Sequence, residues 1–306
     1  MANIHVVGSC NMDLVMQLPN LPGPGNTVTG GILHQLLGGK GANQAVAAAR
    51  SGASVVMHGA VGKDAFGAAV TQGLIGDGIE CTFIQNNHGM ATGTAVILVD
   101  QRGENLIGVA SGANRNVKPP SKLHLIDAGA VLLQSEIPIE VIMTTMEAAS
   151  KAHVPIIFNN APAMGVPPEA LASVHVLIVN EHEAALMTGL TVHDRPSAMQ
   201  AANTLRASGV RCVIVTLGPA GCAVSSVDTV FDLPSFVVDT VDTTAAGDTF
   251  CGAFTARFVA GDTLAEATVY ASAAAALSTT ILGAQPSVPT EVAVRAFLAS
   301  APTQRP

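Results

Sequence analysis

The segment from Val241 to Phe250 reads Val-Asp-Thr-Thr-Ala-Ala-Gly-Asp-Thr-Phe and leads into a predicted helix that ends near Ala260. The first N–H groups of a helix have no partners within it, and the helix dipole favours negative charge there. Asp248 falls in the first turn, where a carboxylate could take a proton from a hydroxyl beside a bound phosphoryl group. It could also simply complement the dipole, and this segment alone does not decide between the two roles.

A second candidate for ligand binding is the glycine-rich run Gly38-Gly39-Lys40-Gly41-Ala42-Asn43, which leads into a predicted helix starting at Gln44. Glycines allow a ligand to approach the backbone closely. The run does not fit the dinucleotide motif GxGxxG, because Gln44 stands at the last glycine. It does not fit the P-loop either, because Gly41 follows Lys40 where Ser or Thr is required. A loop that presents Lys40 and Asn43 suits a neutral polyhydroxy ligand at least as well.

Further polar side chains follow predicted strands. Asn11 and Asp13 come after a strand from Ile4 to Gly8 and alternate about Met12, so both can point to one side of an extended segment. Glu136 and Asn180 each follow an apolar run. In a parallel sheet, ligands bind outside the carboxyl ends of the strands. These residues are therefore expected at one rim of the sheet.

Each of these groups also has an ordinary structural interpretation. Glu136 could be a surface acid before Pro138, and Asn180 with Glu183 could cap a helix. The segment Gly218–Gly221 could be a plain hairpin turn. Their joint placement at one rim is what favours a binding site over these alternatives.

The order of the elements predicts the fold class. Apolar strands alternate with helices, as in an α/β protein with a doubly wound, mostly parallel sheet flanked by helices. Strands are predicted at residues 54–61, 94–99, 130–134, 154–159, 176–179 and 212–216, and helices at 66–76, 139–152, 181–188, 196–208 and 267–282. Two regions without helices, about 13–35 and 91–108, could pair into a small second sheet. We expect one domain over residues 1–306 with this β appendage.

The amino-acid composition limits the kinds of partner and the cellular location that the protein can have. The chain of 306 residues has a net charge of −8 and no basic run, which argues against a nucleic-acid partner. Its five cysteines form no CxxC pair and suggest reduced thiols. No signal peptide is visible, and the most apolar stretch, Ala267–Leu282, is shorter than the ~20 residues of a membrane span. The sequence therefore predicts a cytoplasmic protein without a membrane segment.

These motifs together resemble the ribokinase-like (PfkB) carbohydrate kinases over nearly the whole chain, from Gly8–Asp13 to Gly283–Pro289. The most specific motifs are Gly38–Ala45, Asn159–Ala163, Asn180–Glu183 and Asp242–Phe250. The resemblance implies ATP-dependent transfer of a phosphoryl group to a primary sugar hydroxyl, with D-ribose the leading substrate. The alternatives are 2-deoxyribose or another small furanose. A non-catalytic sugar sensor would be expected to lack Asp248 or the glycines, and a dehydrogenase would need GxGxxG.

The resemblance also implies roles for single residues. Asp248 would be the catalytic base, and the backbone N–H groups of Ala245, Ala246 and Gly247 would form the anion hole. Glu183 would help to position Mg²⁺ through water. The sugar would be held by Asn11, Met12, Asp13, Gly39, Lys40, Gly41, Ala42, Asn43 and Glu136. The nucleotide would be held by Asn180, Thr216, Leu217, Gly218, Pro219, Ala220, Gly221, Gly247 and Ser272.

Members of this family also bind an activating monovalent cation, and their β appendage acts as a lid and commonly as a homodimer interface. The positions implied for K⁺ are Asp242, Thr244, Ser278, Ile281, Gly283 and Ser287. The chain departs from the family pattern in three places. Ile281-Leu282 stands where basic residues are common, Cys251 replaces an Asn, and Ser272 replaces a His. Backbone carbonyl ligands would keep the cation site intact despite the first change.

Overall fold

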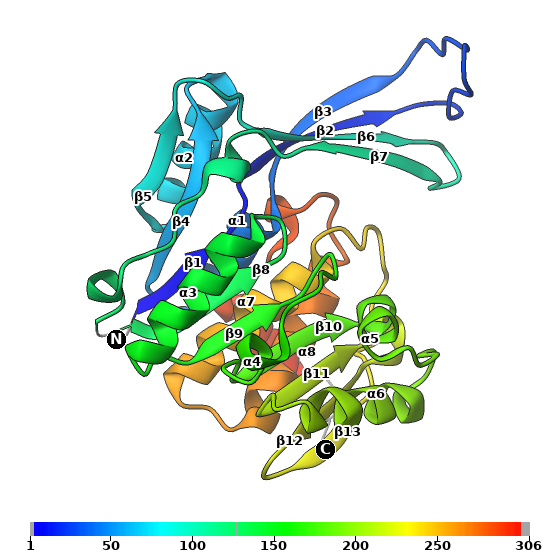
Figure 1. Ribbon diagram of the computed structural model, residues 1–306. Helices are drawn as coiled ribbons and strands as arrows, with labels where there is room; N and C mark the ends of the chain where they lie inside the picture. Colours follow the sequence, from blue (N-terminus) through cyan, green and yellow to red (C-terminus); the bar gives the residue numbers. More distant parts are fainter. Residues whose placement is uncertain (1–2, 127, 301–306) are drawn as a thin grey trace.

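The computed structural model describes residues 3–126 and 128–300 and contains a nine-stranded sheet between two layers of helices (Figure 1). The strand order is β13-β12-β11-β10-β9-β8-β1-β4-β5, and only the pairs β11–β12 and β12–β13 are antiparallel. The strands are β1 (Asn3–Val7), β4 (Val55–Gly62), β5 (Glu80–Asn87), β8 (Ala128–Gln134), β9 (Ile156–Asn159), β10 (Val176–Asn180), β11 (Cys212–Thr216), β12 (Cys222–Ser226) and β13 (Val230–Leu233). The predicted doubly wound, mostly parallel α/β fold is confirmed.

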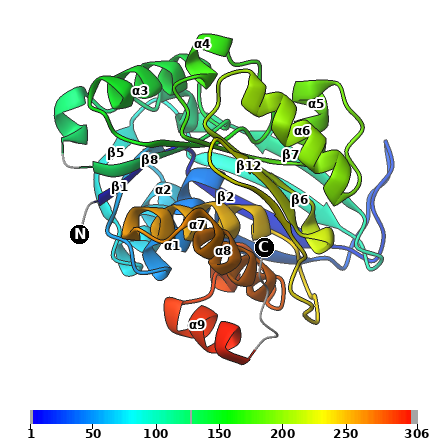
Figure 2. The same cartoon turned by 90° about the horizontal axis from the view of Figure 1, so that it is seen from below.

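Helices cover both faces of this sheet, as the view from below shows (Figure 2). One layer holds α1 (Lys40–Arg50), α2 (Ala65–Gly76), α7 (Ala246–Ala260) and α8 (Leu264–Ser278), with α9 (Glu291–Ser300) packed on α8. The other holds α3 (Ile139–Lys151), α4 (Pro168–Leu171), α5 (Glu181–Thr188) and α6 (Arg195–Ala207). Side chains alternate between the two hydrophobic cores along a strand: Leu132 of β8 belongs to one and Leu133 to the other. This is why the central strands are continuous apolar runs.

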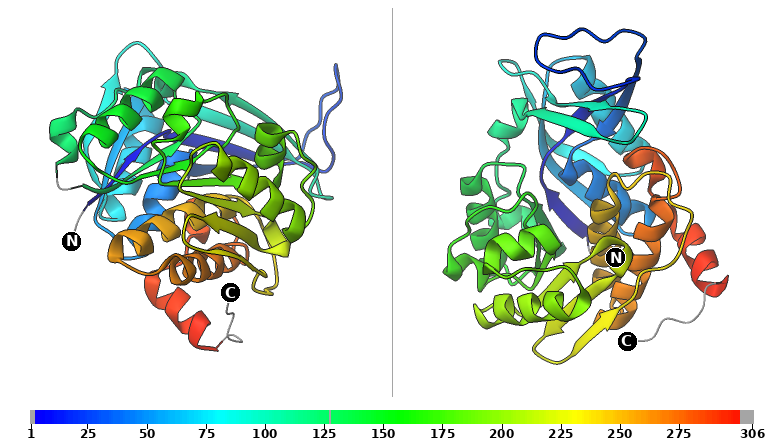
Figure 3. Two further views of the ribbon diagram at one scale, coloured as in Figure 1. Left: turned by 60° about the horizontal axis from the view of Figure 1, so that its bottom comes forward. Right: turned by 90° about the vertical axis from the view of Figure 1, so that its right-hand side faces the viewer.

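The two regions without helices form a separate sheet that projects from the body (Figure 3). Its order is β3-β2-β6-β7, from β2 (Asn11–Gln17), β3 (Ile32–Gly38), β6 (Gly93–Val99) and β7 (Asn105–Ala110). The expected second sheet is thus confirmed, although residues 27–30 lie before β3 and not within a strand. Large apolar side chains on this sheet are exposed, among them Ile32 and Ile107, both at 60%.

The helix predicted over Ala267–Leu282 differs from the observed one at both ends. The hydroxyl of Thr263 accepts a hydrogen bond from the Glu266 N–H, so α8 already begins at Leu264. At the other end, the hydroxyls of Ser278, Thr279 and Thr280 donate to carbonyls three residues earlier. Hydroxyl side chains compete with the helical backbone in this way, and α8 ends at Ser278. Within the described part of the chain, no helix combines the length and apolar character needed to cross a membrane.

Candidate active site

The start of α7 has the geometry of an anion site. Ala245 precedes the helix in the left-handed conformation (φ 59°), and the N–H groups of Ala245 and Gly247 have no hydrogen-bond acceptor among the described residues. The N–H of Ala246 donates to the Thr243 carbonyl at 3.2 Å. Two of the three N–H groups predicted for the anion hole are therefore free, and the third makes a long bond that an anion can replace.

The carboxylate of Asp248 lies in the first turn of α7 and is 6% exposed. Its Oδ2 atom accepts a hydrogen bond from Asn43 Nδ2 at 3.0 Å, and Oδ1 accepts one from Gln44 Nε2 at 2.9 Å. The glycine-rich run is thus placed against the predicted base. Asp248 also raises the pKa of Lys40, which keeps this ammonium charged near the site.

The glycines of this run explain how the backbone of α1 enters the site. Gly39 has φ 89°, a conformation that other residues rarely adopt. A Cβ atom on Gly41 would lie 2.5 Å from the backbone nitrogen of Ser9. Ala42 lies in the hydrophobic core, as does Met12 of β2, so the side chains of these two predicted sugar-binding residues face away from the site. Only the backbone of these two residues is available to a sugar.

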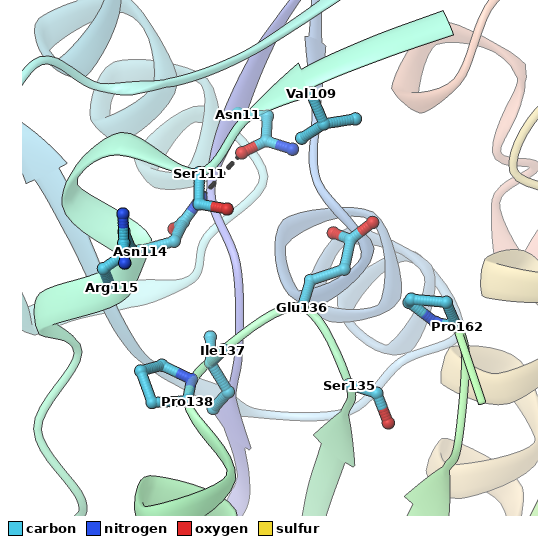
Figure 4. A pocket seen from close by; sticks show the side chains of 10 residues that line it. All are labelled: Asn11, Val109, Ser111, Asn114, Arg115, Ser135, Glu136, Ile137, Pro138 and Pro162. Carbon is cyan, nitrogen blue, oxygen red and sulfur yellow. Dashed lines mark hydrogen bonds between the residues drawn. The ribbon is translucent and has the colours of Figure 1, made fainter. Parts of the chain in front are cut away.

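A cavity of about 500 Å³ lies at the carboxyl ends of β1 and β8, and two of the polar residues predicted for the sugar, Asn11 and Glu136, line it (Figure 4). The predicted residues Asp13, Lys40 and Asn43 are not part of its lining. The side chains of Asn11 and Glu136 both point into it. Glu136 Oε2 accepts hydrogen bonds from Ser9 Oγ at 2.6 Å and from the Lys40 N–H at 3.0 Å. Glu136 is therefore fixed between the loop that contains Ser9 and the start of α1, and its interpretation as a surface acid is not supported.

Asp13 follows Asn11 on the same face of β2, as the alternation predicts. Its carboxylate lies against Gly38, where a Cβ atom would be 2.0 Å from Oδ2, and Oδ1 is buried without a partner among the described residues. Burial, with the nearby charges of Glu136 and Asp248, raises the pKa of Asp13 to about 7. An unpaired buried acceptor of this kind is suited to a ligand hydroxyl.

A second cavity of about 550 Å³ lies at the start of α7, and Gly247 is part of its wall. Its apolar wall includes Phe236 and Phe250. Of the residues predicted to hold the nucleotide, it contains Asn180, Thr216, Gly218, Pro219, Gly221, Gly247 and Ser272. The side chain of Leu217 instead belongs to the hydrophobic core. Ala220 lies in the short 3₁₀ turn η3 (Gly218–Ala220), outside the cavity lining.

Asn180 and Glu183 form the helix cap that the sequence allowed as an alternative. Asn180 Oδ1 accepts a bond from the Glu183 N–H at 2.8 Å, and Glu183 Oε2 accepts one from the Asn180 N–H at 2.9 Å. Glu183 is 8% exposed, and burial raises the pKa of its carboxyl. Its charge interacts with Lys40 and Asp248, so the cap lies close to the predicted base. Capping does not exclude the predicted contact with Mg²⁺ through water.

The positions predicted for K⁺ lie in the segment before α7 and in the segment from the last residue of α8, Ser278, to Ser287. Asp242 Oδ1 accepts hydrogen bonds from the N–H and hydroxyl of Thr244, and Oδ2 accepts one from the Gly283 N–H. Ser278 and Ser287 are buried, while Ile281 is 51% exposed. The side chain of Ile281 has no atom that can bind a cation, so only its backbone carbonyl could be a ligand. Cys251 is buried one turn after Asp248 and lies outside both cavity linings.

Several residues of the site were not predicted as site residues from the sequence. Asn114, in the 3₁₀ turn η1 (Gly112–Asn116), donates from Nδ2 to Asn11 Oδ1 at 2.7 Å. This bond leaves the Asn11 Nδ2 group free to donate into the cavity. Ser9 fixes Glu136, and Gln44 contacts Asp248. Ser9 and Gln44 lie within two of the motifs recognised in the sequence, and their place in those motifs could have identified them as site residues. Asn114 gave no such signal.

Comparison with known proteins agrees with this geometry. The sequence profile of the pfkB family of carbohydrate kinases matches residues 1–291. The chain belongs to this family. The family resemblance inferred from the motifs is thereby confirmed, as is the predicted enzyme class of carbohydrate kinase.

Named relatives cover nearly the whole chain. It is 37% identical to the ribokinase of Haemophilus influenzae over 96% of this chain and 98% of the relative. It is 32% identical to the deoxyribokinase of Salmonella typhi, with 94% and 95% covered. The structure of Arabidopsis thaliana ribokinase complexed with ribose and ATP superimposes with a TM-score of 0.90 at 33% identity, over 97% of this chain and 99% of the other.

Proposed function

We propose that this protein is an ATP-dependent kinase that converts D-ribose to D-ribose 5-phosphate, with Asp248 as the general base. The observation that carries the proposal is that hydrogen bonds connect the start of α7, which lines one cavity, to Glu136, which lines the other. Gly247 lines the cavity assigned to ATP. Asp248, the next residue, is hydrogen-bonded to Asn43 of α1, and the N–H of Lys40 at the start of the same helix donates to Glu136 in the sugar cavity.

The mechanism follows from this placement. Asp248 takes the proton of the sugar hydroxyl as the hydroxyl oxygen attacks the terminal phosphorus of ATP, and the bond from this phosphorus to the bridging oxygen breaks to release ADP. The free N–H groups of Ala245 and Gly247 stabilise the negative charge on the transferred group. Lys40, charged and close to Asp248, adds positive charge on the sugar side. The apolar walls of the second cavity, including Phe236 and Phe250, suit the adenine base.

Two metal ions belong to this proposal. Among the described residues, no cluster of three or more His, Cys, Asp or Glu side chains is arranged to hold a metal. Mg²⁺ would therefore be bound mainly by the phosphates and water, as it often is, with Glu183 contributing through a water molecule. Glu183 fits, because its cap uses Oε2 and leaves Oε1 available. K⁺ would be held by one carboxylate, Asp242, and loop carbonyls, which is the ligand type that hard cations prefer.

We also propose that two chains form a homodimer through the small sheet, which would act as a lid over the sugar. The exposed large apolar side chains of this sheet support the proposal, because apolar side chains that gather on one exposed element are typical of an interface. A cytoplasmic location is supported by the five free cysteines.

A coupled assay of ADP release tests the function. Purified protein is given ATP and Mg²⁺ with D-ribose, 2-deoxy-D-ribose, D-xylose or D-arabinose in turn, and the product is examined by phosphorus NMR. We expect the highest kcat/KM with D-ribose and phosphorylation at O5. A higher kcat/KM with 2-deoxy-D-ribose would identify a deoxyribose kinase. ADP release with none of the sugars would refute the proposed activity.

A further inference from the structure

A chain of hydrogen bonds connects three buried amide side chains to Asp248, and none of the three lines either cavity. Gln134 is the last residue of β8, Asn159 is the last residue of β9, and Gln44 lies in α1. Gln44 and Gln134 are fully buried, and Asn159 is 7% exposed. Burying polar amides is costly unless they are hydrogen-bonded, so their arrangement requires an explanation.

The partners of Gln44 fix the orientation of its amide. A carboxylate only accepts hydrogen bonds, so Gln44 must turn its Nε2 group toward Asp248 Oδ1, at 2.9 Å. The same Nε2 group lies 2.9 Å from Asn159 Oδ1. Asn159 is oriented in turn, because its Nδ2 donates to the Ile178 carbonyl at 3.0 Å. Both hydrogens of the Gln44 amide are therefore used, and its oxygen points the other way.

Gln134 supplies the donor for that oxygen. Its Nε2 group donates to Gln44 Oε1 at 2.7 Å, while its own Oε1 has no partner among the described residues. The absence of a side chain on Gly8 makes room for it, since a Cβ atom there would lie 2.0 Å from Gln134 Oε1. Gln134 is fully buried and has no access to a substrate. Its interaction with the site thus passes through Gln44.

We propose that Gln44 is a positioning residue for Asp248 and that Gln134, as a donor, is compatible only with the Gln44 amide orientation that donates to Asp248. With Gln44 on Oδ1 and Asn43 on Oδ2, the carboxylate plane is fixed, and so are the lone pairs that face the acceptor hydroxyl. A general base acts only when it lies within hydrogen-bond reach of the proton it takes. This proposal rests on the proposed role of Asp248 as the base in sugar phosphorylation.

The decisive variant is Gln134→Glu. An ionised carboxylate at this position offers only acceptors, so the Gln44 amide would rotate to donate to it and turn its oxygen toward Asp248. The protonated form of the introduced carboxyl would donate as Gln134 does. Burial raises the pKa of an introduced carboxyl, which brings this change into the range of the assay. Relative to wild type at the same pH, we expect kcat to be nearly unchanged near pH 6 and to fall about 10²-fold by pH 9, with KM for ribose within about threefold.

Gln134→Met is the matched control. It removes the donor without adding an acceptor, so Gln44 keeps both of its own acceptors. We expect a lower melting temperature but a kcat within about threefold of wild type at every pH, because the amide orientation is retained. Equal losses of kcat in the two variants at all pH values would show a purely structural role and overturn the proposal. A wild-type pH profile for Gln134→Glu would overturn it as well.

Gln44→Glu covers the case in which Gln134→Glu does not fold. It preserves an acceptor for Gln134 but places a carboxylate against Asp248. We expect a similar fall in kcat, with ribose and ADP affinities by calorimetry close to wild type, whereas an unchanged kcat would refute the proposal. The proposed function is judged separately, from the wild-type protein. If wild type prefers another sugar, the variants are compared on that sugar.

Discussion

The Oδ2 atom of Asp242 accepts a 2.8 Å hydrogen bond from the backbone N–H of Gly283 and so joins two loops that are 41 residues apart in the chain. The other oxygen, Oδ1, accepts bonds from the N–H and hydroxyl of Thr244. Asp242 therefore holds the segment that leads into the anion hole against the loop that follows α8. A cation bound between these loops would stiffen the same segment.

We predict that K⁺ activates the enzyme although Ile281 and Leu282 occupy the usual place of basic residues. Carbonyl ligands do not depend on side-chain identity, and a fixed loop preorganises the anion hole. Turnover at saturating ribose and ATP should be at least about tenfold higher in K⁺ than in tetramethylammonium at equal ionic strength. Asp242→Ala should lose this difference. Equal rates in both salts for wild type, with Asp242→Ala harmless, would contradict the prediction.

Replacement of the base should affect turnover and not binding. Asp248→Asn retains the shape of the side chain but cannot take the hydroxyl proton, and it places an amide opposite the donors of Asn43 and Gln44. We expect kcat to fall by about 10²–10⁴-fold. Calorimetric affinities for ribose and an ATP analogue should remain close to wild type. Near wild-type turnover would exclude Asp248 from this role.

Asp13→Ala should weaken sugar binding selectively. The carboxylate lies on the same face of β2 as Asn11, at the rim that carries Glu136. Its loss would leave hydroxyls of bound ribose unpaired, so KM for ribose should rise much more than KM for ATP. An unchanged ribose affinity by calorimetry would show that the sugar binds elsewhere.

The same residue should make sugar binding depend on pH. Burial, with Glu136 and Asp248, raises the pKa of Asp13 to about 7. The carboxyl therefore loses its proton as the pH rises through this value, and the ionised form accepts hydroxyl bonds with both oxygens. Ribose affinity of the wild-type protein should increase from about pH 6 to about pH 8, and Asp13→Asn should show no such increase. A wild-type affinity that is flat over this range would contradict the assignment.

Acid should destabilise the fold through a buried histidine pair. His5 Nδ1 lies 2.9 Å from His58 Nε2, and burial, with the imidazoles of His5 and His124, lowers the pKa of His58 to about 3. In the unfolded chain the pKa is about 6.5, so the unfolded state binds more protons below that pH. The contribution of His58 to stability is therefore complete above about pH 6.5 and decreases as the pH falls.

Urea unfolding of wild type and His58→Gln from about pH 7.5 to about pH 5 measures this effect. The variant should lose less stability on acidification, by about 1 kcal/mol per pH unit below pH 6.5. Comparing the two proteins cancels the contribution of other groups, such as Asp13, whose raised pKa acts in the opposite direction. Parallel stability curves would refute the role of His58.

The proposed dimer can be tested on β7. Leu106 and Ile107 are 51% and 60% exposed and point to opposite faces of the small sheet. The double variant Leu106→Lys/Ile107→Lys places a charge on each face and should yield monomers by sedimentation velocity. Leu186→Lys is the control, because Leu186 is 77% exposed but lies on α5, outside the small sheet. Dimers in the double variant, or monomers in wild type, would contradict the proposal.

The sequence alone determined the features that depend on neighbouring residues. The order of apolar runs predicts the doubly wound sheet, since each central strand is covered on both faces. The alternation of Asn11 and Asp13 places both on one face of a strand, and the spacing of Asn180 and Glu183 allows the reciprocal cap. The small residues before Asp248 predict an anion site. In each case the interactions that determine the feature involve residues only a few positions apart in the chain.

The tertiary structure alone decided how distant residues share hydrogen bonds. Gln44 and Asp248 are separated by 204 positions, and Asn11 and Asn114 by 103. The direction of an amide depends on which acceptors surround it, and those acceptors come from other strands and helices. Core packing likewise turned Met12 and Leu217 away from the site, because their burial in the apolar core is favourable. Local spacing does not encode either outcome, since both depend on contacts between elements that are far apart in the chain.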